Sequence, residues 1–268
     1  AGDNALELVF IAVDYSRCRR IYQCYTSNLH FLGSSSIPTN ATASNSRYNG
    51  TVASSEWSTL YSTAWASFCA GEFGISAGLV DGAGRLLSVA TSRDASPPVV
   101  GQPLGQSPIA HAELNALAGV SRESLSMTRC LLTTLTPCPM CHHAAGVAEV
   151  TEIRYAGIDH GALSASSQTG YGGRPLPRMS QVGDEIDVLF FELLPLVGSL
   201  RLRGTQGSAF RWYRERLDPM GELGVELARE RTFGAGGEWT TECRRLAPRL
   251  RGIGQWRMTT SAHLTPNA

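Results

Sequence analysis

The sequence predicts an α/β domain in which helices cover the faces of a mixed or parallel sheet. Between residues 57 and 155, stretches with helical apolar spacing alternate with short apolar runs that are bounded by Gly and Pro. The expected order is helix, hairpin, helix, strand, helix, strand, and such alternation is typical of a sheet with helices packed on its faces. After residue 181 the apolar spacing is helical, so we expect a helical C-terminal extension.

The first helix is predicted over residues 57–69, because its apolar residues recur at three-and-four spacing and Gly71 can end it. These apolar residues are Trp57, Leu60, Tyr61, Ala64, Trp65, Phe68 and Cys69. A β-hairpin follows. The apolar runs 75–80 and 85–90 flank an Asp-Gly-Ala-Gly turn, which can supply a positive φ.

The following stretch alternates helices with strands. After a loop rich in Pro, Gly and Ser, residues 112–120 favour a short helix. Residues 130–135 form a predicted strand that ends before Pro137, since proline cannot continue a ladder of hydrogen bonds. A second helix is expected over 138–148 and a further strand over 151–155.

The two ends of the chain are expected to lie outside this domain. Residues 33–56 contain hardly any large apolar side chain, so they cannot offset the entropy of ordering and form a predicted linker. Residues 5–14 are an apolar run that fits a strand or a short helix. A Gly/Ser-rich loop is expected up to about Gly183. The predicted C-terminal helices cover 186–197, with an interruption at Pro195, and 208–231. The resulting division is 1–56 for an N-terminal extension and linker, 57–180 for the central domain and 181–268 for the helical extension.

Charge and cysteine content narrow the classes of function. Twenty-three basic residues, all of them Arg, balance twenty-three acidic ones, so no overall charge draws the chain to nucleic acid or to an anionic membrane. The absence of Lys excludes Schiff-base and P-loop lysine chemistry. Seven Cys without a disulfide framework fit a reducing compartment, and we expect a cytoplasmic protein without a membrane span. The Arg-rich tail after Thr232 is expected to be a solvated helix face or a frayed end.

Two short motifs carry the chemistry. His111-Ala112-Glu113 stands at the start of one predicted helix, and Pro137-Cys138-Pro139-Met140-Cys141 starts the next. Imidazole and two thiolates suit zinc, and three protein ligands leave the fourth position for water, as in catalytic sites. Two Cys three residues apart share one face at a helix start, where the helix dipole favours thiolate. We therefore predict His111, Cys138 and Cys141 as zinc ligands.

Glu113 lies two residues beyond His111, close enough to reach a water on the metal without competing as a ligand. Zinc lowers the pKa of such a water toward roughly 7. Glu113 is the predicted proton shuttle, which takes that proton and returns it to a ring nitrogen and to a departing amine. This chemistry suits a carbon that bears an exocyclic amine, as in cytosine, adenine and guanine.

The two motifs match the H-x-E…P-C-x-x-C pattern of zinc-dependent nucleobase deaminases. From about Trp57 to Asp159, including Gly71-Glu72-Phe73-Gly74, the chain resembles the cytidine and deoxycytidylate deaminase superfamily. The branch with tRNA adenosine, guanine and cytosine deaminases is the most similar. The resemblance implies a three-layer α/β/α fold with a mixed five-stranded sheet, and it implies the same zinc ligands and proton shuttle as those predicted above.

The sequence departs from the family pattern at two positions. Many members have an Asn after the hairpin that holds the base, whereas this chain has Ser92. The tRNA and guanine branches have Glu directly before Pro-Cys, whereas Thr136 stands here and is closer to the Ser of cytosine deaminases. This second difference favours a pyrimidine. We expect Ser92, Ala112 and Pro137 to contact the substrate.

The predicted function is zinc-dependent hydrolytic deamination of a small nucleobase, nucleoside or nucleotide, with a cytosine-type base favoured. One alternative is a tRNA adenosine or single-stranded DNA base deaminase, which needs a basic groove that the balanced charge disfavours. A second alternative is a non-catalytic, zinc-stabilised binding module. A closed zinc site with His142 or His143 as fourth ligand also stays open, as does a homodimer.

Overall fold

The computed structural model describes residues 54–160 and 175–264, and the statements about structure below refer to these residues. The apolar run predicted at 5–14 and the predicted linker up to residue 53 lie outside the described residues. The same holds for residues 161–174 of the predicted Gly/Ser-rich loop.

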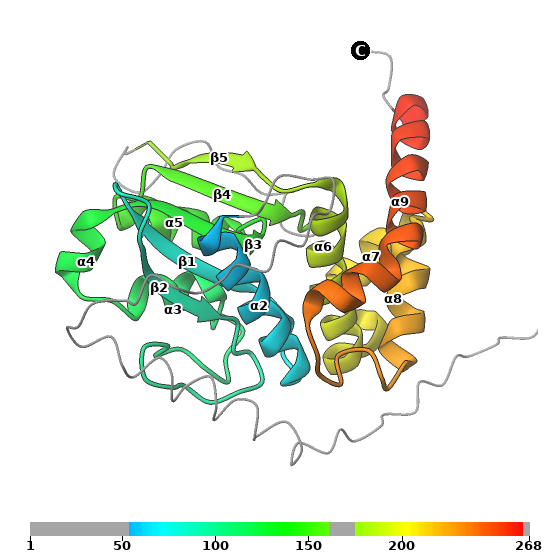
Figure 1. The fold of residues 1–268 in the computed structure, drawn as a ribbon, viewed down its shortest axis with the longest axis horizontal. Helices are drawn as coiled ribbons and strands as arrows, with labels where there is room; N and C mark the ends of the chain where they lie inside the picture. Colours follow the sequence, from blue (N-terminus) through cyan, green and yellow to red (C-terminus); the bar gives the residue numbers. More distant parts are fainter. Residues whose placement is uncertain (1–53, 161–174, 265–268) are drawn as a thin grey trace, which may run out of the picture. The chain divides into compact units, whose positions relative to one another are not determined.

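A mixed five-stranded sheet has the strand order β2-β1-β3-β4-β5 (Figure 1). β1 (Ser76–Asp81) pairs antiparallel with both β2 (Leu86–Thr91) and β3 (Thr128–Leu135). β4 (Glu152–Gly157) and β5 (Arg178–Gln181) continue the sheet parallel to β3. The structure therefore confirms the predicted hairpin, the two later strands and the mixed sheet.

The hairpin turn shows why its sequence folds this way. Asp81 Oδ1 accepts hydrogen bonds from the backbone N–H groups of Ala83 (2.8 Å) and Arg85 (2.9 Å). Gly84 has a φ of 81°, a conformation that costs glycine little and other residues more. The positive φ expected from the Asp-Gly-Ala-Gly sequence is confirmed.

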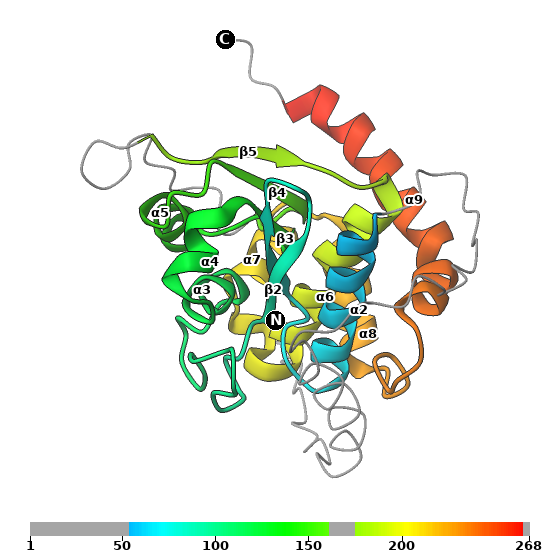
Figure 2. The same ribbon diagram turned by 60° about the vertical axis from the view of Figure 1, so that its left-hand side comes forward.

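Helices cover both faces of the sheet, and Figure 2 shows α3 and α5 on one side of it and α2 and α6 on the other. Ala116 and Ala145 from the first pair of helices pack with Leu131 of β3 in one buried core. This arrangement confirms the three-layer α/β/α fold. The four helices are α2 (Ser55–Cys69), α3 (Ala112–Ala118), α5 (Pro139–Val147) and α6 (Glu185–Arg203).

Two elements were not expected from the sequence. Helix α4 (Arg122–Met127) has no buried residue, so it lacks the apolar periodicity that reveals a helix. Its one local signal is Ser121, whose side chain accepts a hydrogen bond from the backbone N–H of Ser124 (3.2 Å). Strand β5 is exposed along its whole length, so its pairing with β4 is not marked by alternating apolar residues.

The C-terminal region is helical, as predicted, and begins with α6. This helix runs without a break across Pro195, so the predicted interruption there is wrong. Almost every residue from Leu189 to Leu200 is buried, because α6 packs against the sheet, α2 and the later helices. This packing outweighs the cost of roughly 3 kcal/mol that proline brings to a helix interior. The later helices are α7 (Ser208–Glu215), α8 (Pro219–Arg229) and α9 (Trp239–Leu264), with a short 3-10 helix, η3 (Gly204–Gln206), before α7.

The C-terminal helices share one apolar core with α2. Tyr61 stacks on Phe191 of α6 with 4.1 Å between the ring centroids. Trp65 Nε1 donates a hydrogen bond to the backbone oxygen of Gly237 (2.8 Å), and the Trp65 ring meets Phe233 edge to face. The division of the chain at residue 180 stays a prediction, but the apolar core extends across it.

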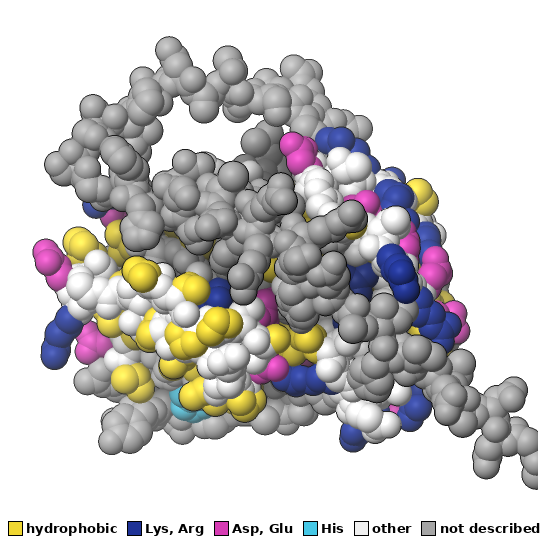
Figure 3. Space-filling view, turned by 90° about the horizontal axis from the view of Figure 1, so that it is seen from below, with side chains coloured by type: hydrophobic (Ala, Val, Ile, Leu, Met, Phe, Trp, Pro, Cys, Tyr) yellow, Lys and Arg dark blue, Asp and Glu magenta, His cyan; other side chains and the backbone are white. Residues whose placement is uncertain are grey.

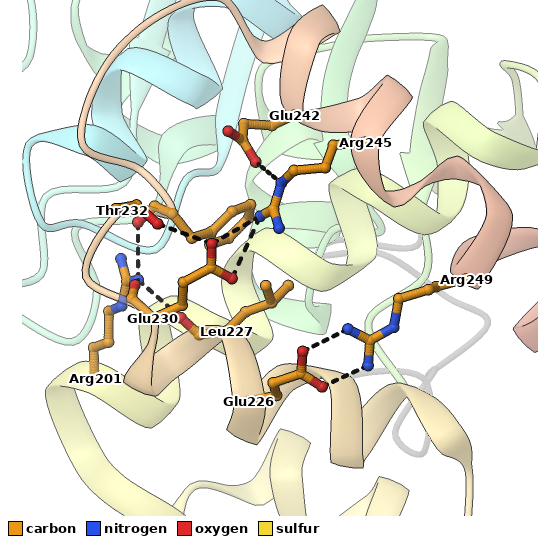
Figure 4. A network of polar contacts seen from close by, with 9 residues as sticks. Arg201, Glu226, Leu227, Glu230, Thr232, Glu242, Arg245 and Arg249 are labelled. Atoms are coloured by element: carbon orange, nitrogen blue, oxygen red, sulfur yellow. Dashed lines mark hydrogen bonds and ion pairs between the residues drawn. The ribbon is translucent and has the colours of Figure 1, made fainter.

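Charged side chains on the C-terminal helices pair with one another. Arg249 of α9 binds both carboxylate oxygens of Glu226, and Arg245 bridges Glu230 and Glu242 (Figure 4). Figure 3 shows basic and acidic side chains interspersed on the right-hand side of the face seen from below. The Arg-rich tail is thus a helix with paired charges. Within the described ranges, no helix combines the length and the apolar character that crossing a membrane requires.

Candidate functional site

The three predicted zinc ligands converge at the N-termini of α3 and α5. His111 is the N-cap of α3, Cys138 is the N-cap of α5, and Cys141 lies in the first turn of α5. The two helices begin near each other because β2 and β3 are both antiparallel to β1, so that these two strands end at the same edge of the sheet. The sheet topology therefore brings together two motifs that are separated in sequence.

The distances between the donor atoms fit zinc. His111 Nδ1 lies 3.5 Å from Cys138 Sγ and 3.4 Å from Cys141 Sγ, and the two sulfur atoms are 3.5 Å apart. A tetrahedral zinc ion with ordinary bond lengths needs about 3.8 Å between two sulfur atoms and about 3.5 Å between sulfur and nitrogen. One nitrogen and two sulfur donors in this arrangement match a catalytic zinc site with one position left for water.

The closed site with a fourth protein ligand finds no support in the described residues. His142 Nε2 lies 2.9 Å from the backbone oxygen of Pro177, and His143 Nδ1 lies 2.7 Å from that of Pro139. Neither belongs to the group of side chains whose ligand atoms gather at the cluster. Both histidines are instead ordinary residues of α5.

The cluster favours a negative charge on sulfur. The hydrogen bond with Cys141 and the contact with His111 lower the pKa of Cys138 to about 4, despite partial burial. The same contact with Cys138 raises the pKa of His111 to about 9. The neighbouring sulfur of Cys138, together with burial, raises the pKa of the Cys141 thiol. Zinc binds cysteine as thiolate, so metal binding at this cluster would release the protons that the two sulfur atoms still carry.

Glu113 lies beside the cluster without belonging to it. Its carboxyl group is buried, with 4% of the residue exposed, and burial raises its pKa. Thr133 Oγ1 donates a hydrogen bond to Oε1 (3.3 Å), and Cys141 Sγ lies 3.6 Å from Oε2. The structure thus holds a protonatable carboxyl group next to the ligand atoms.

A cavity of about 280 Å³ opens at this point and is lined by His111, Glu113 and Cys138. Ser92 and Ala112, which were expected to contact the substrate, also line it. The Ser92 hydroxyl is buried and has no hydrogen-bond partner among the described residues, so it is available to a ligand. Pro137 is buried but is not among the described residues that line the cavity, so the structure does not bring it to the site.

The C-terminal region supplies another wall of the same cavity, which the sequence did not reveal. Its residues come from α6, α7 and the segment after β4, and they belong to no short motif. The sequence contains one relevant signal, because Glu192 interrupts the apolar run Leu-Phe-Phe-Glu-Leu-Leu and a buried acid needs a partner. The polar residues of this wall are Asp159, His160, Glu192, Ser199, Arg203 and Tyr213.

Glu192 is the centre of a buried polar network. Its Oε1 accepts hydrogen bonds from Tyr213 Oη (2.6 Å) and Arg257 Nη2 (2.7 Å), and its Oε2 accepts one from Arg257 Nη1 (3.1 Å). Arg257 Nε also donates to Asp218 Oδ2 (2.8 Å). Burial opposes ionisation of Glu192, but His160 and Arg257 outweigh it and lower its pKa. The network therefore joins α6, α7 and α9 at the cavity wall.

One of three comparisons with known proteins bears on the motif. Residues 55–156 match the family model of the cytidine and deoxycytidylate deaminase zinc-binding region. No curated protein matches the chain. One similar solved structure comes from a study of A-to-I editing by tRNA:A34 deaminases, with 23% identity over 47% of this chain and 97% of that chain and a TM-score of 0.35. A guanine deaminase from Nitrosomonas europaea has 18% identity over 55% of this chain and 80% of that chain, also with a TM-score of 0.35. Likeness at these TM-scores supports no conclusion about this chain.

The matched segment contains both motifs, the hairpin and four of the five strands. The cluster of one histidine and two cysteines that could hold a metal ion lies within this zinc-binding region. The resemblance seen in the sequence is therefore confirmed for this part of the chain. Residues 55–156 match the cytidine and deoxycytidylate deaminase zinc-binding region.

Proposed function

We propose that this chain is a zinc-dependent hydrolytic deaminase that removes the exocyclic amine of a small nucleobase, nucleoside or nucleotide and releases ammonia. The observation that carries the proposal is the buried carboxyl group of Glu113, which lies beside the donor atoms of His111, Cys138 and Cys141 and lines the cavity. A structural zinc site does not need such a group, and burying a carboxyl group costs folding free energy. Its position next to the donor atoms supports a catalytic site over a binding module.

Zinc held by the three ligands would supply an activated water. Glu113 would hold and transfer the protons. Thr133 fixes its Oε1 through a hydrogen bond, and the buried carboxyl group would hold a proton between attack and departure of the amine. It would give the proton to the ring nitrogen and then pass one to the leaving amine, a contribution of about 10² to 10⁴ in rate. Overall one C–O bond forms, one C–N bond breaks, and water is consumed as ammonia leaves.

Two features support a small substrate, and a third favours a cytosine-type base. The cavity is compact, at about 280 Å³, and α6 and α7 contribute to its wall. The formal net charge of the chain is zero, and Arg245 and Arg249 of α9 are engaged in ion pairs. Thr136 lines the cavity at the position that the family resemblance associates with cytosine deaminases, which favours a cytosine-type base.

The thiols Cys130 and Cys243 are free, which supports a reducing, cytoplasmic setting.

Ammonia release from a panel of bases, nucleosides and nucleotides tests the proposal, with zinc-loaded protein and a Glu113→Ala variant. We expect turnover of at least one panel member by the wild type and a loss of at least about 10²-fold in the variant. Glu123→Ala is the matched control, because Glu123 is an exposed acid in the first turn of α4 and should leave the rate unchanged. Equal rates in the Glu113 variant and the wild type would contradict the mechanism.

The same preparation separates the alternatives. Single-stranded DNA and tRNA are sequenced after incubation with the enzyme. Edited bases in either polymer, together with no ammonia release from the panel, would show that the substrate is a polynucleotide and not a small molecule. One bound zinc ion per chain without turnover of any substrate would leave the zinc-stabilised binding module as the remaining hypothesis.

A further inference from the structure

His160 lies in the segment after β4 and lines the same cavity as Glu113. Its ring stacks on the indole of Trp212, with 3.8 Å between centroids and an interplanar angle of 10°. The guanidinium carbon of Arg216 lies 4.5 Å from the centroid of the same indole. Two groups this close to one centroid cannot share a face, so Trp212 is held between Arg216 and His160. The orientation of the His160 ring is therefore set by a layered stack.

The edges of the ring are constrained as well. Tyr213 meets it edge to face at 85°, with 5.8 Å between centroids. His160 Nε2 lies 3.2 Å from Glu192 Oε1, although it makes no properly aligned hydrogen bond to any described residue. Glu192 is itself fixed by Tyr213 and Arg257. The imidazole is thus locked in place by side chains from α6 and α7.

One surface of the imidazole remains for the cavity. Trp212 covers one ring face, and Trp212 is not among the described residues that line the cavity. The Nε2 edge is buried against Glu192, yet the His160 side chain keeps 18% of its surface exposed. No aromatic contact of the described residues covers the ring face opposite Trp212, so this face can meet a ligand in the cavity. A rigid, flat π surface in a cavity is the chemistry that receives a planar heteroaromatic ring.

We propose that His160 is a substrate-binding residue on which the planar base of the substrate stacks. This inference rests on the proposed deaminase function and adds the residue that recognises the base. Phe73 is the competing platform, because it also lines the cavity and has the guanidinium carbon of Arg203 4.9 Å from its ring centroid. Phe73 has no second aromatic ring stacked behind it in the described contacts, whereas His160 is backed by an indole.

Binding is measured in a Glu113→Ala background, so that the ligand is not consumed. The probes are cytosine, cytidine, adenine and adenosine, titrated into zinc-loaded protein by calorimetry. Adding His160→Ala should weaken binding of the best probe by about 5- to 150-fold, the range that base–aromatic stacking supports. His160→Phe should stay within about threefold of the parent, because a phenyl ring also offers a flat face. Trp256→Ala is the matched control, since Trp256 is a half-buried ring of α9 that does not line the cavity in the described structure.

The outcomes separate this inference from the deaminase proposal. Loss of affinity in His160→Ala with rescue by His160→Phe supports stacking on His160, even if the wild type releases no ammonia from any substrate. Ammonia release with unchanged affinity in His160→Ala overturns the inference and leaves the deaminase in place. Loss of affinity in Phe73→Ala, with unchanged affinity in His160→Ala, overturns the inference and identifies Phe73 as the stacking residue. Equal loss in His160→Ala and His160→Phe, with zinc content and melting temperature retained, excludes a stacking role, as does the failure of every probe to bind.

Discussion

The two walls of the cavity are encoded in different ways. The zinc wall comes from His111, Glu113, Cys138 and Cys141, which all lie in the first turns or caps of two helices. The C-terminal wall depends on Glu192, which is held by side chains from other helices. Residues at the start of one helix are close together in the sequence, so the residues of the first wall form short sequence motifs. The residues of the second wall are brought together by tertiary packing and form almost no sequence motif, although both walls line one cavity.

The largest effect is expected from breaking the zinc wall. Cys141→Ala removes one of three ligands and should lower zinc affinity at least about 100-fold. Changes to residues that only support metal ligands already lower affinity by up to about 100-fold, so loss of a ligand should cost at least as much. Activity should fall with it. Zinc per chain is measured by atomic absorption after dialysis. Cys130→Ala is the control, because Cys130 is a buried thiol of β3 outside the cluster. One tightly held zinc ion in the Cys141 variant would show that Cys141 is not a ligand.

Breaking the C-terminal wall should act mainly on stability. Arg257→Gln leaves the buried Glu192 without its main partner, which we expect to cost about 3–5 kcal/mol. Arg249→Gln, on the same helix, removes an exposed pair with Glu226 and should cost about 0–1 kcal/mol. Urea unfolding of both variants measures the difference. Equal losses would mean that the Glu192 network contributes no more than a surface ion pair.

A smaller effect is expected where α6 meets α9, away from both walls. Burial, aided by the nearby charge of Asp184, raises the pKa of Asp187 from 3.8 to about 7, and Cys243 Sγ lies 3.9 Å from its Oδ1. Because folding favours the protonated form, this residue contributes most below about pH 4, and the contribution is lost as the pH rises toward 7. Asp187→Asn should remove this dependence and raise the melting temperature at pH 8 by a few degrees. Melting curves at pH 5 and pH 8 test it. A variant that keeps the wild-type difference between the two pH values would contradict the assignment.

Much of the central domain could be predicted because its signals are local. The apolar stripe of α2, the Asp-Gly-Ala-Gly turn and the two motifs each fix a structure within a few residues. Helix α4 and strand β5 bury no apolar stripe, so periodicity could not find them. Pro195 was expected to interrupt a helix, since the packing that stabilises α6 around it comes from distant parts of the chain.

The site residues likewise divide into those that the sequence predicts and those that depend on tertiary packing. Among the residues expected to contact the substrate, Ser92 and Ala112 line the cavity, and Pro137 does not, because it is buried at the junction between β3 and α5. His160 and Tyr213 could not be recognised, since their place in the cavity depends on how α6 and α7 pack. Glu192 could have been noticed as an acid within an apolar run, but its partner Arg257 lies on α9 and is not marked in the sequence.

The apolar core shared by α2 and the last helices bears on how the chain is made. Tyr61 and Trp65 find their partners in Phe191 and Phe233. At 5–20 residues per second, roughly 6–23 s of synthesis separate the end of α2 at Cys69 from the start of α6 at Glu185. During that interval Tyr61 lacks Phe191, and Trp65 lacks Phe233 for longer still because Phe233 follows α8, so we expect the nascent chain to expose the aromatic face of α2 after its zinc motif has been made.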